Sequence, residues 1–149
     1  MLKHVALIFS VVVALLASSA SASPPRPAKS DYLVTEGAGF LMHKGEGVIY
    51  AMTFAVRKEI TDPLYVDVVY ENPADAKAPL VVPGSIKPGQ KEFLSESPGI
   101  PAIKNRKTYR VEVRLFSDEA RTHQVGKHVQ DVQFEIPKGM EDFYDVKLL

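Results

Sequence analysis

The feature that most constrains the fold of this chain is a strict alternation of side-chain type along several short stretches. Residues 48–57 carry large apolar side chains at every second position, and the residues between them are mostly small or polar: Ile49, Ala51, Thr53, Ala55 and Arg57. Residues 108–116 repeat the pattern, with Tyr109, Val111, Val113 and Leu115 alternating with Arg110, Glu112 and Arg114. A period of two is the repeat of a β-strand that buries one face. Both stretches therefore predict half-buried antiparallel strands.

Weaker versions of this pattern occupy most of the remaining chain. They cover residues 32–34, 40–42, 64–70, 80–82, 91–95 and 126–136, and residues rich in glycine, proline and asparagine separate them. No stretch of ten residues or more shows the 3.6-residue period of an amphipathic helix. About seven short strands in just over one hundred residues predict one all-β domain over residues 31–137, built as a two-sheet antiparallel β-sandwich.

One segment carries a family resemblance. Residues 103–113 read Ile-Lys-Asn-Arg-Lys-Thr-Tyr-Arg-Val-Glu-Val, in which an apolar residue precedes a tight turn and a tyrosine then opens an alternating strand. This resembles the start of strand F in fibronectin type III and other immunoglobulin-like domains. The resemblance implies an immunoglobulin-like sandwich in which Tyr109 forms a tyrosine corner, its hydroxyl bonded to backbone upstream. The chain departs from antibody domains, since it has neither cysteine nor tryptophan. Met52 or Phe54 is expected to fill the tryptophan's volume against Val111 and Val113.

The N-terminus predicts export. Lys3 and His4 precede an apolar run over residues 5–17, which is shorter than the about 20 residues of a spanning helix. Ala20-Ser21-Ala22 is an A-x-A cleavage site, so residues 1–22 are predicted to be a signal peptide removed before Ser23. The alternative is an uncleaved anchor.

The composition limits which cellular compartment and which classes of partner are expected. Cleavage leaves 149 − 22 = 127 residues, and removing Lys3 leaves 17 basic against 18 acidic side chains. This balance favours neither nucleic acid nor anionic lipid as a partner. The absence of cysteine, of a lipid attachment site and of an N-x-S/T acceptor favours a bacterial periplasm or exterior and a soluble protein without a membrane span or lipid anchor. The oligomeric state stays open.

Two segments flank the predicted domain. Residues 23–30 contain Pro24, Pro25 and Pro27 and are predicted to be a stiff linker. Residues 138–149 form an apolar tail that includes Phe143 and Tyr144. The tail is predicted either to add a last strand or cover a sheet edge, or to dock a partner.

Three histidines raise the question of metal. His123 and His128 are five residues apart near the last predicted hairpin, close in sequence to Asp118, Glu119 and Asp131, and His43 is a third candidate. Imidazole and carboxylate groups suit zinc or copper. The spacing matches no known metal motif, and exposed or strand-paired histidines are the alternative.

The sequence offers little for catalysis. It has no G-x-S-x-G, no thiol and no phosphate-binding loop, and a set of Ser117, His123 and Asp118 exists on paper only. We therefore expect a non-enzymatic binding or accessory module of the bacterial envelope, without a cofactor, that contacts a protein partner. The expected contact residues lie in the loop 117–126 and in the tail: Asp118, Arg121, His123, Phe143 and Tyr144. The alternative is a small periplasmic metal-binding protein.

Overall fold

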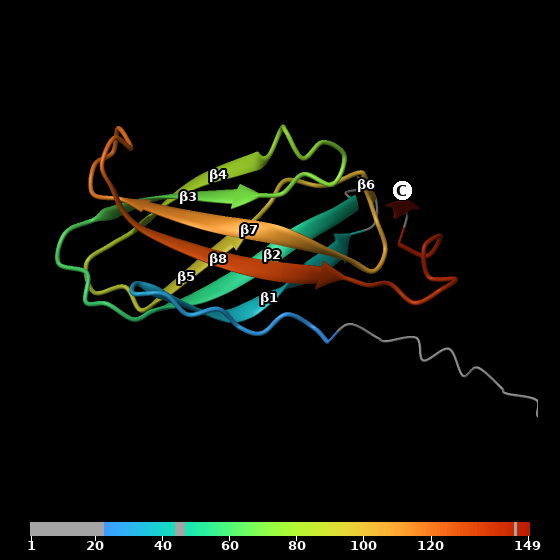
Figure 1. Cartoon of the computed structure of the whole chain (residues 1–149), viewed down its shortest axis with the longest axis horizontal. Coiled ribbons are helices and arrows are strands. Elements are labelled where there is room, and N and C mark those ends of the chain that lie inside the picture. Colours follow the sequence, from blue (N-terminus) through green and yellow to red (C-terminus); the bar gives the residue numbers. More distant parts are fainter. Residues whose placement is uncertain (1–22, 44–46, 145) are drawn as a thin grey trace, which may run out of the picture.

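The computed structural model describes residues 23–43, 47–144 and 146–149; the predicted signal peptide, residues 1–22, lies outside this range. The described residues form nine strands and no helix, so the fold is all-β (Figure 1). Their bounds are β1 Leu33–His43, β2 Gly47–Val56, β3 Leu64–Tyr70, β4 Leu80–Ile86, β5 Glu92–Glu96, β6 Ala102–Ile103, β7 Lys107–Phe116, β8 Gln124–Phe134 and β9 Lys147–Leu148. Within the described part of the chain, no helix is long and apolar enough to cross a membrane.

Two antiparallel sheets carry the fold. One has the strand order β1-β2-β5 and the other the order β4-β3-β7-β8. Their inward side chains form one hydrophobic core, and the two sheets lie as layers across it in Figure 1. The edge strands β1 and β8 are neighbours along one side, and β4 and β5 along the other. This arrangement is compatible with the predicted β-sandwich.

The strand count differs from the prediction of about seven, because β6 and β9 form a third, parallel two-stranded ladder. The glycines that suggested a break in the first strand do not end it. β1 runs without interruption to His43, with one irregularity in register between Thr35 and Gly37, where Glu36 is the extra residue. Similarly, β4 continues through Pro83 and Gly84, since an edge strand tolerates proline.

Tyrosine and phenylalanine rings fill the centre of the sandwich. Tyr50 of β2 packs against Tyr70 of β3, with 5.0 Å between ring centroids, and edge-on against Tyr109 of β7 at 6.4 Å. Phe40 of β1 contacts Tyr50 at 4.5 Å and Phe134 of β8 at 5.2 Å. These rings cross from one sheet to the other, and Met52 and Phe54 are buried in the same core as Val111 and Val113.

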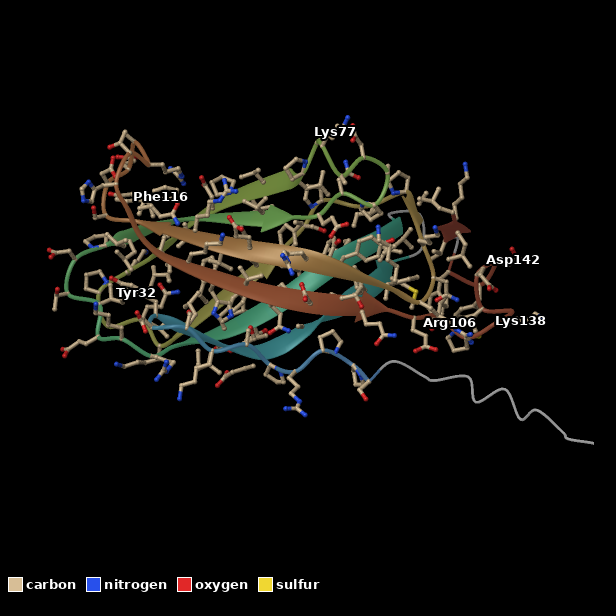
Figure 2. All side chains as sticks on the ribbon, in the orientation of Figure 1. Tyr32, Lys77, Arg106, Phe116, Lys138 and Asp142 are labelled. Atoms are coloured by element: carbon tan, nitrogen blue, oxygen red, sulfur yellow. The ribbon has the colours of Figure 1, made fainter. Side chains whose placement is uncertain are left out.

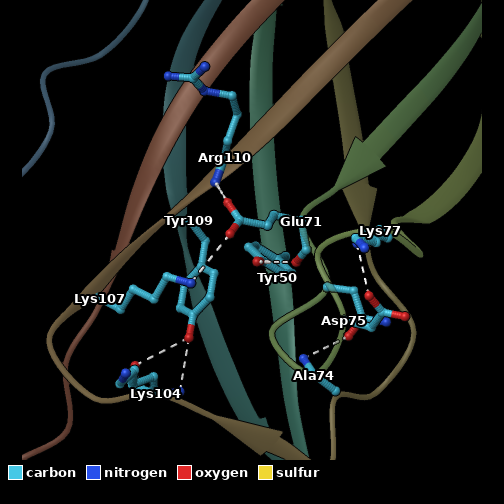
Figure 3. Close-up of polar contacts among 10 residues, drawn as sticks. Tyr50, Glu71, Ala74, Asp75, Lys77, Lys104, Lys107, Tyr109 and Arg110 are labelled. Carbon is cyan, nitrogen blue, oxygen red and sulfur yellow. Dashed lines mark hydrogen bonds and ion pairs between the residues drawn. The ribbon is translucent and has the colours of Figure 1, made fainter.

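Each buried phenol in this cluster has a hydrogen-bond partner, as it must in an apolar interior. The Tyr50 hydroxyl donates to the Glu71 carbonyl at 2.7 Å and the Tyr70 hydroxyl to Ser95 Oγ at 2.6 Å. The Tyr109 hydroxyl accepts from the Lys104 N–H at 2.9 Å and donates to the Lys104 carbonyl at 3.4 Å (Figure 3). Burial raises the pKa of Tyr70 to about 12, so these groups stay protonated.

Candidate functional site

The loop between β7 and β8 is organised by Asp118. The loop closes where the Ser117 N–H donates to the His123 carbonyl at 3.0 Å. The Asp118 carboxylate accepts from Thr122 Oγ1 at 2.6 Å, from the Thr122 N–H at 3.0 Å and from the His123 N–H at 2.7 Å. The side-chain and backbone hydrogen bonds from Thr122 hold the pKa of Asp118 below its ordinary value. Asp118 therefore shapes the loop from within, and its carboxylate is already engaged.

Arg121 fixes the same loop to the neighbouring sheet. Its backbone is left-handed, with φ 58°, and its Nε donates to Asp67 of β3 at 2.6 Å. Its guanidinium also donates to the Glu119 carbonyl at 2.9 Å. Two of the residues predicted to contact a partner thus bind this chain itself, whereas the side chain of His123 is exposed. A shallow hollow of about 270 Å³ lies beside the loop, lined in part by Tyr32, Ile60, Leu64 and Val125.

The C-terminal tail lies against the body of the protein. β9 pairs with β6, the Leu149 N–H donates to the Ile103 carbonyl at 3.0 Å, and Val146 is buried. Phe143 is 69% exposed and stacks edge-on against Tyr144 at 4.8 Å. Figure 2 places Phe116, where β7 leads into the loop, at one end of the molecule and Asp142 of the tail at the other. The structure therefore does not bring the two predicted contact regions together.

His128 and His123 have different surroundings in the structure. His128 is buried, with Nε2 2.8 Å from Thr35 Oγ1 and Nδ1 2.8 Å from Ser30 Oγ, so both ring nitrogens are occupied. His123 is exposed in the loop, and His43 ends β1 with a side chain outside the described set. Among the residues that the structure describes, no group of three or more His, Cys, Asp or Glu side chains could hold a metal ion.

Residues 23–30, here called the N-terminal strap, contact the edges of both sheets, where the sequence suggested a linker. The strap runs beside β1 and β8 in Figure 1. The Ala28 N–H donates to Gln130 Oε1 at 2.7 Å, and Gln130 Nε2 donates to the Arg26 carbonyl at 3.1 Å. The Ala28 carbonyl accepts from the Thr35 N–H at 2.9 Å. The strap thus closes the seam between β1 and β8.

The outer face of the β4-β3-β7-β8 sheet, here called the charged face, is a ladder of ion pairs. Arg114 Nε lies 2.6 Å from one Glu112 oxygen, and Lys127 Nζ lies 3.1 Å from the other. Arg110 pairs with Asp131 at 3.1 Å. Partial burial would raise the pKa of Glu112, but the hydrogen bonds from Arg114 and Lys127 outweigh it and lower that pKa. This is the ordinary chemistry of a solvated sheet face.

The outer face of the β1-β2-β5 sheet, here called the small-residue face, is built differently. The register sets its members in rows across the three strands, and they are Val34, Ala55 and Glu92; Gly37, Thr53 and Leu94; Gly39, Ala51 and Glu96; and Leu41 and Ile49. None of these residues takes part in an ion pair of the described structure. Leu94 is 63% exposed and Leu41 is 41% exposed. A Cβ placed on Gly39 would meet nothing within 4 Å, so the face is open above β1.

Sequence reasoning did not single out this face as functional. The signal was available in residues 48–57, where the positions between the large apolar residues are Ile49, Ala51, Thr53 and Ala55. A strand with one face to water usually carries charges there, as β7 does. What the sequence could not supply is the register that places Gly37 and Gly39 on one side of β2 and Leu94 on the other.

Comparison of the chain with protein families, with characterised proteins and with solved structures finds no match.

Proposed function

We propose that this protein is an exported, non-enzymatic binding module of the bacterial cell envelope, with an immunoglobulin-like sandwich that docks a protein partner. The seven strands of the two larger sheets and the bonding of Tyr109 to the Lys104 backbone support the immunoglobulin-like fold. The single observation that carries the binding function is the contrast between the small-residue face and the charged face.

The small-residue face suits a flat protein surface. By strand geometry it extends about 20 Å along the strands and about 10 Å across them. Exposed side chains that are small and apolar can be desolvated at low cost, because they have little side-chain entropy to lose and few water contacts to replace. Such a patch fits the centre of an interface, whose core is depleted of charge.

Charge determines which partner fits. Glu92 and Glu96 stand on either side of Leu94 along the edge strand β5. The partner that fits is an apolar surface flanked by lysine or arginine, which would pair with the two carboxylates. A second copy of this chain would bury the same carboxylates with no lysine or arginine among the face residues named above to pair with them. A sugar ligand would find no aromatic ring on which to stack.

The test uses two matched substitutions on the two outer faces. Leu94→Lys adds a cation to the small-residue face, where a partner with basic residues would be repelled. We expect partner affinity to fall at least about tenfold, which is about 1.4 kcal/mol. Val81→Lys is the control, because Val81 is 52% exposed on edge strand β4 of the other sheet. We expect it to leave affinity unchanged.

The partner is first identified with photo-crosslinking side chains at Thr53 on the face, His123 in the loop and Phe143 in the tail. Its affinity for each variant is then measured with purified proteins. A partner crosslinked from Thr53 and weakened by Leu94→Lys supports the proposal. Crosslinking from His123 or Phe143 alone would keep the binding function but move the contact to the loop or the tail. No crosslink from any position, together with turnover of a substrate, would overturn the function.

A further inference from the structure

His128 joins three segments that are distant in sequence. Its imidazole, on β8, contacts Ser30 of the strap and Thr35 of β1, each 2.8 Å away. The ring lies edge-on to Phe54 of β2, with 5.5 Å between ring centroids, and is only 1% exposed. The histidine is therefore a buried connection between the strap and both sheets.

The rest of the strap is held lightly. Gln130, which is 3% exposed, supplies two of its hydrogen bonds, and the backbone supplies few others. Pro24, Pro25 and Pro27 have no N–H to donate. Between this part of the strap and the strands is a cavity of about 280 Å³. The strap is accordingly joined to its neighbours by fewer hydrogen bonds than the strands β1 and β8, which are paired along most of their length.

Protonation changes what His128 requires. The neutral ring donates through one nitrogen and accepts through the other, and two hydroxyl groups can turn to suit either tautomer. The imidazolium donates through both nitrogens and carries a charge that burial strongly disfavours.

No buried acid compensates that charge in the described structure. Facing His128 are Thr35 from β1, Phe54 from β2 and Ser30 from the strap, and its register partner on β7 is Val113. None of these side chains is charged. The charged side chains nearest in sequence to these contacts are at the surface, and they are Lys29, Asp31, Glu36, Arg57 and Lys127. Arg57 donates to the Ser30 carbonyl, so the charged side chain bonded to this strap residue is a cation and not an acid.

We propose that His128 is a pH-operated latch: protonation releases the N-terminal strap from β1 and β8 and opens the seam between the two sheets. The latch is independent of whether the small-residue face binds a partner.

The direction follows from the burial of the imidazole. Burial lowers the pKa of His128 in the closed form, whereas a released strap exposes the ring, whose pKa then returns toward about 6.5. The stability of the closed form relative to the open form is therefore greatest above about pH 6.5 and decreases as the pH falls below that value. If the closed form stays unprotonated, the open population rises up to about 30-fold by pH 5.0.

The test is amide hydrogen exchange of the purified protein at pH 7.5 and pH 5.0, corrected for the intrinsic pH dependence of exchange. The reporting amides are those of Ala28, Ser30 and Thr35, which donate to Gln130, Leu33 and Ala28. We expect their protection to fall at least tenfold at pH 5.0 while the β3–β7 ladder stays protected. His128→Gln keeps polar atoms but cannot titrate, so it should abolish the pH dependence. His123→Gln, in the exposed loop, should preserve it.

A second measurement tests the latch in the unaltered protein and so does not depend on the His128→Gln variant. Proton resonances of the His128 ring in the unaltered protein should titrate with the same midpoint as the strap amides. Equal strap protection at the two pH values would overturn the latch, as would a pH dependence that persists in a folded His128→Gln variant. Binding by the small-residue face is measured separately, so failure of one proposal leaves the other intact.

Discussion

At the scale of single residues, the interior of this protein depends on polar groups that are all paired. In the described part of the chain, every buried side-chain nitrogen and oxygen has a hydrogen-bond partner. Tyr109 illustrates why the residue type matters, because its hydroxyl both accepts from and donates to the backbone of Lys104. A phenylalanine would fill the same volume and leave that backbone amide without its partner.

Tyr109→Phe should therefore lower the free energy of unfolding by about 1–2 kcal/mol, the usual cost of leaving a buried group unpaired. Urea denaturation followed by circular dichroism measures it. Tyr65→Phe makes the same chemical change on the outer side of β3, where no hydrogen bond of the phenol is found in the described structure. That control should change stability by no more than about 0.5 kcal/mol. Equal effects of the two substitutions would argue against the structural role of the Tyr109 hydroxyl.

At the scale of elements, two glycines of the first hairpin differ in whether the backbone requires a residue without a side chain. Gly47 begins β2 with φ 79°, and a Cβ there would collide with the Ile100 carbonyl, which accepts a hydrogen bond from the Val48 N–H. Gly39 lies within β1, opposite Ala51, with open space where its Cβ would be. Only the first position requires glycine for its backbone.

Gly47→Ala should destabilise the protein by about 2 kcal/mol or more, since strain from the left-handed backbone adds to the collision. Gly39→Ala should lower stability by no more than about 0.5 kcal/mol. Thermal unfolding of the two variants side by side makes the comparison. A harmless Gly47→Ala would show that the start of β2 adapts to a side chain.

These elements also show how far sequence reasoning reaches. The alternation of apolar and other residues predicted β2, β3 and β7 to within one residue at each end. Each of these strands has one face in the core, so every second residue must be apolar. The pattern placed a break near Gly37 and Gly39 because glycine disfavours strands locally, yet pairing along β2 supplies the missing stability. β6 and β9 are two residues each and depend on each other across the chain, so no local pattern reveals them.

For the candidate site residues too, the sequence predicted what depends on local pattern and missed what depends on contacts between distant segments. The exposed position of His123 agrees with its polar surroundings in sequence. The engagement of Arg121 with Asp67 and of His128 with Ser30 joins residues 54 and 98 positions apart, and only the fold brings them together.

At the scale of the whole molecule, the strap joins the first residues that the structure describes to the last long strand, β8. A chain that begins at Asp31 loses the strap, so Gln130 loses its bonds to Ala28 and Arg26 and His128 loses its contact with Ser30. Its free energy of unfolding should fall by about 2 kcal/mol or more. A chain that begins at Arg26 keeps every residue whose hydrogen bonds hold the strap, so its stability should match that of a chain beginning at Ser23. Guanidinium denaturation of the three purified forms decides this, and equal stabilities would mean that the strap adds nothing.

The bond between Ala28 and Gln130 spans 102 residues, which has a consequence for the order of events during synthesis. The ribosome releases the strap before any of the strands, yet the strap's binding site is complete only when β8 has emerged. The contacts that hold the strap can therefore form only when nearly all of the chain has been made, and docking of the strap is among the last steps of folding.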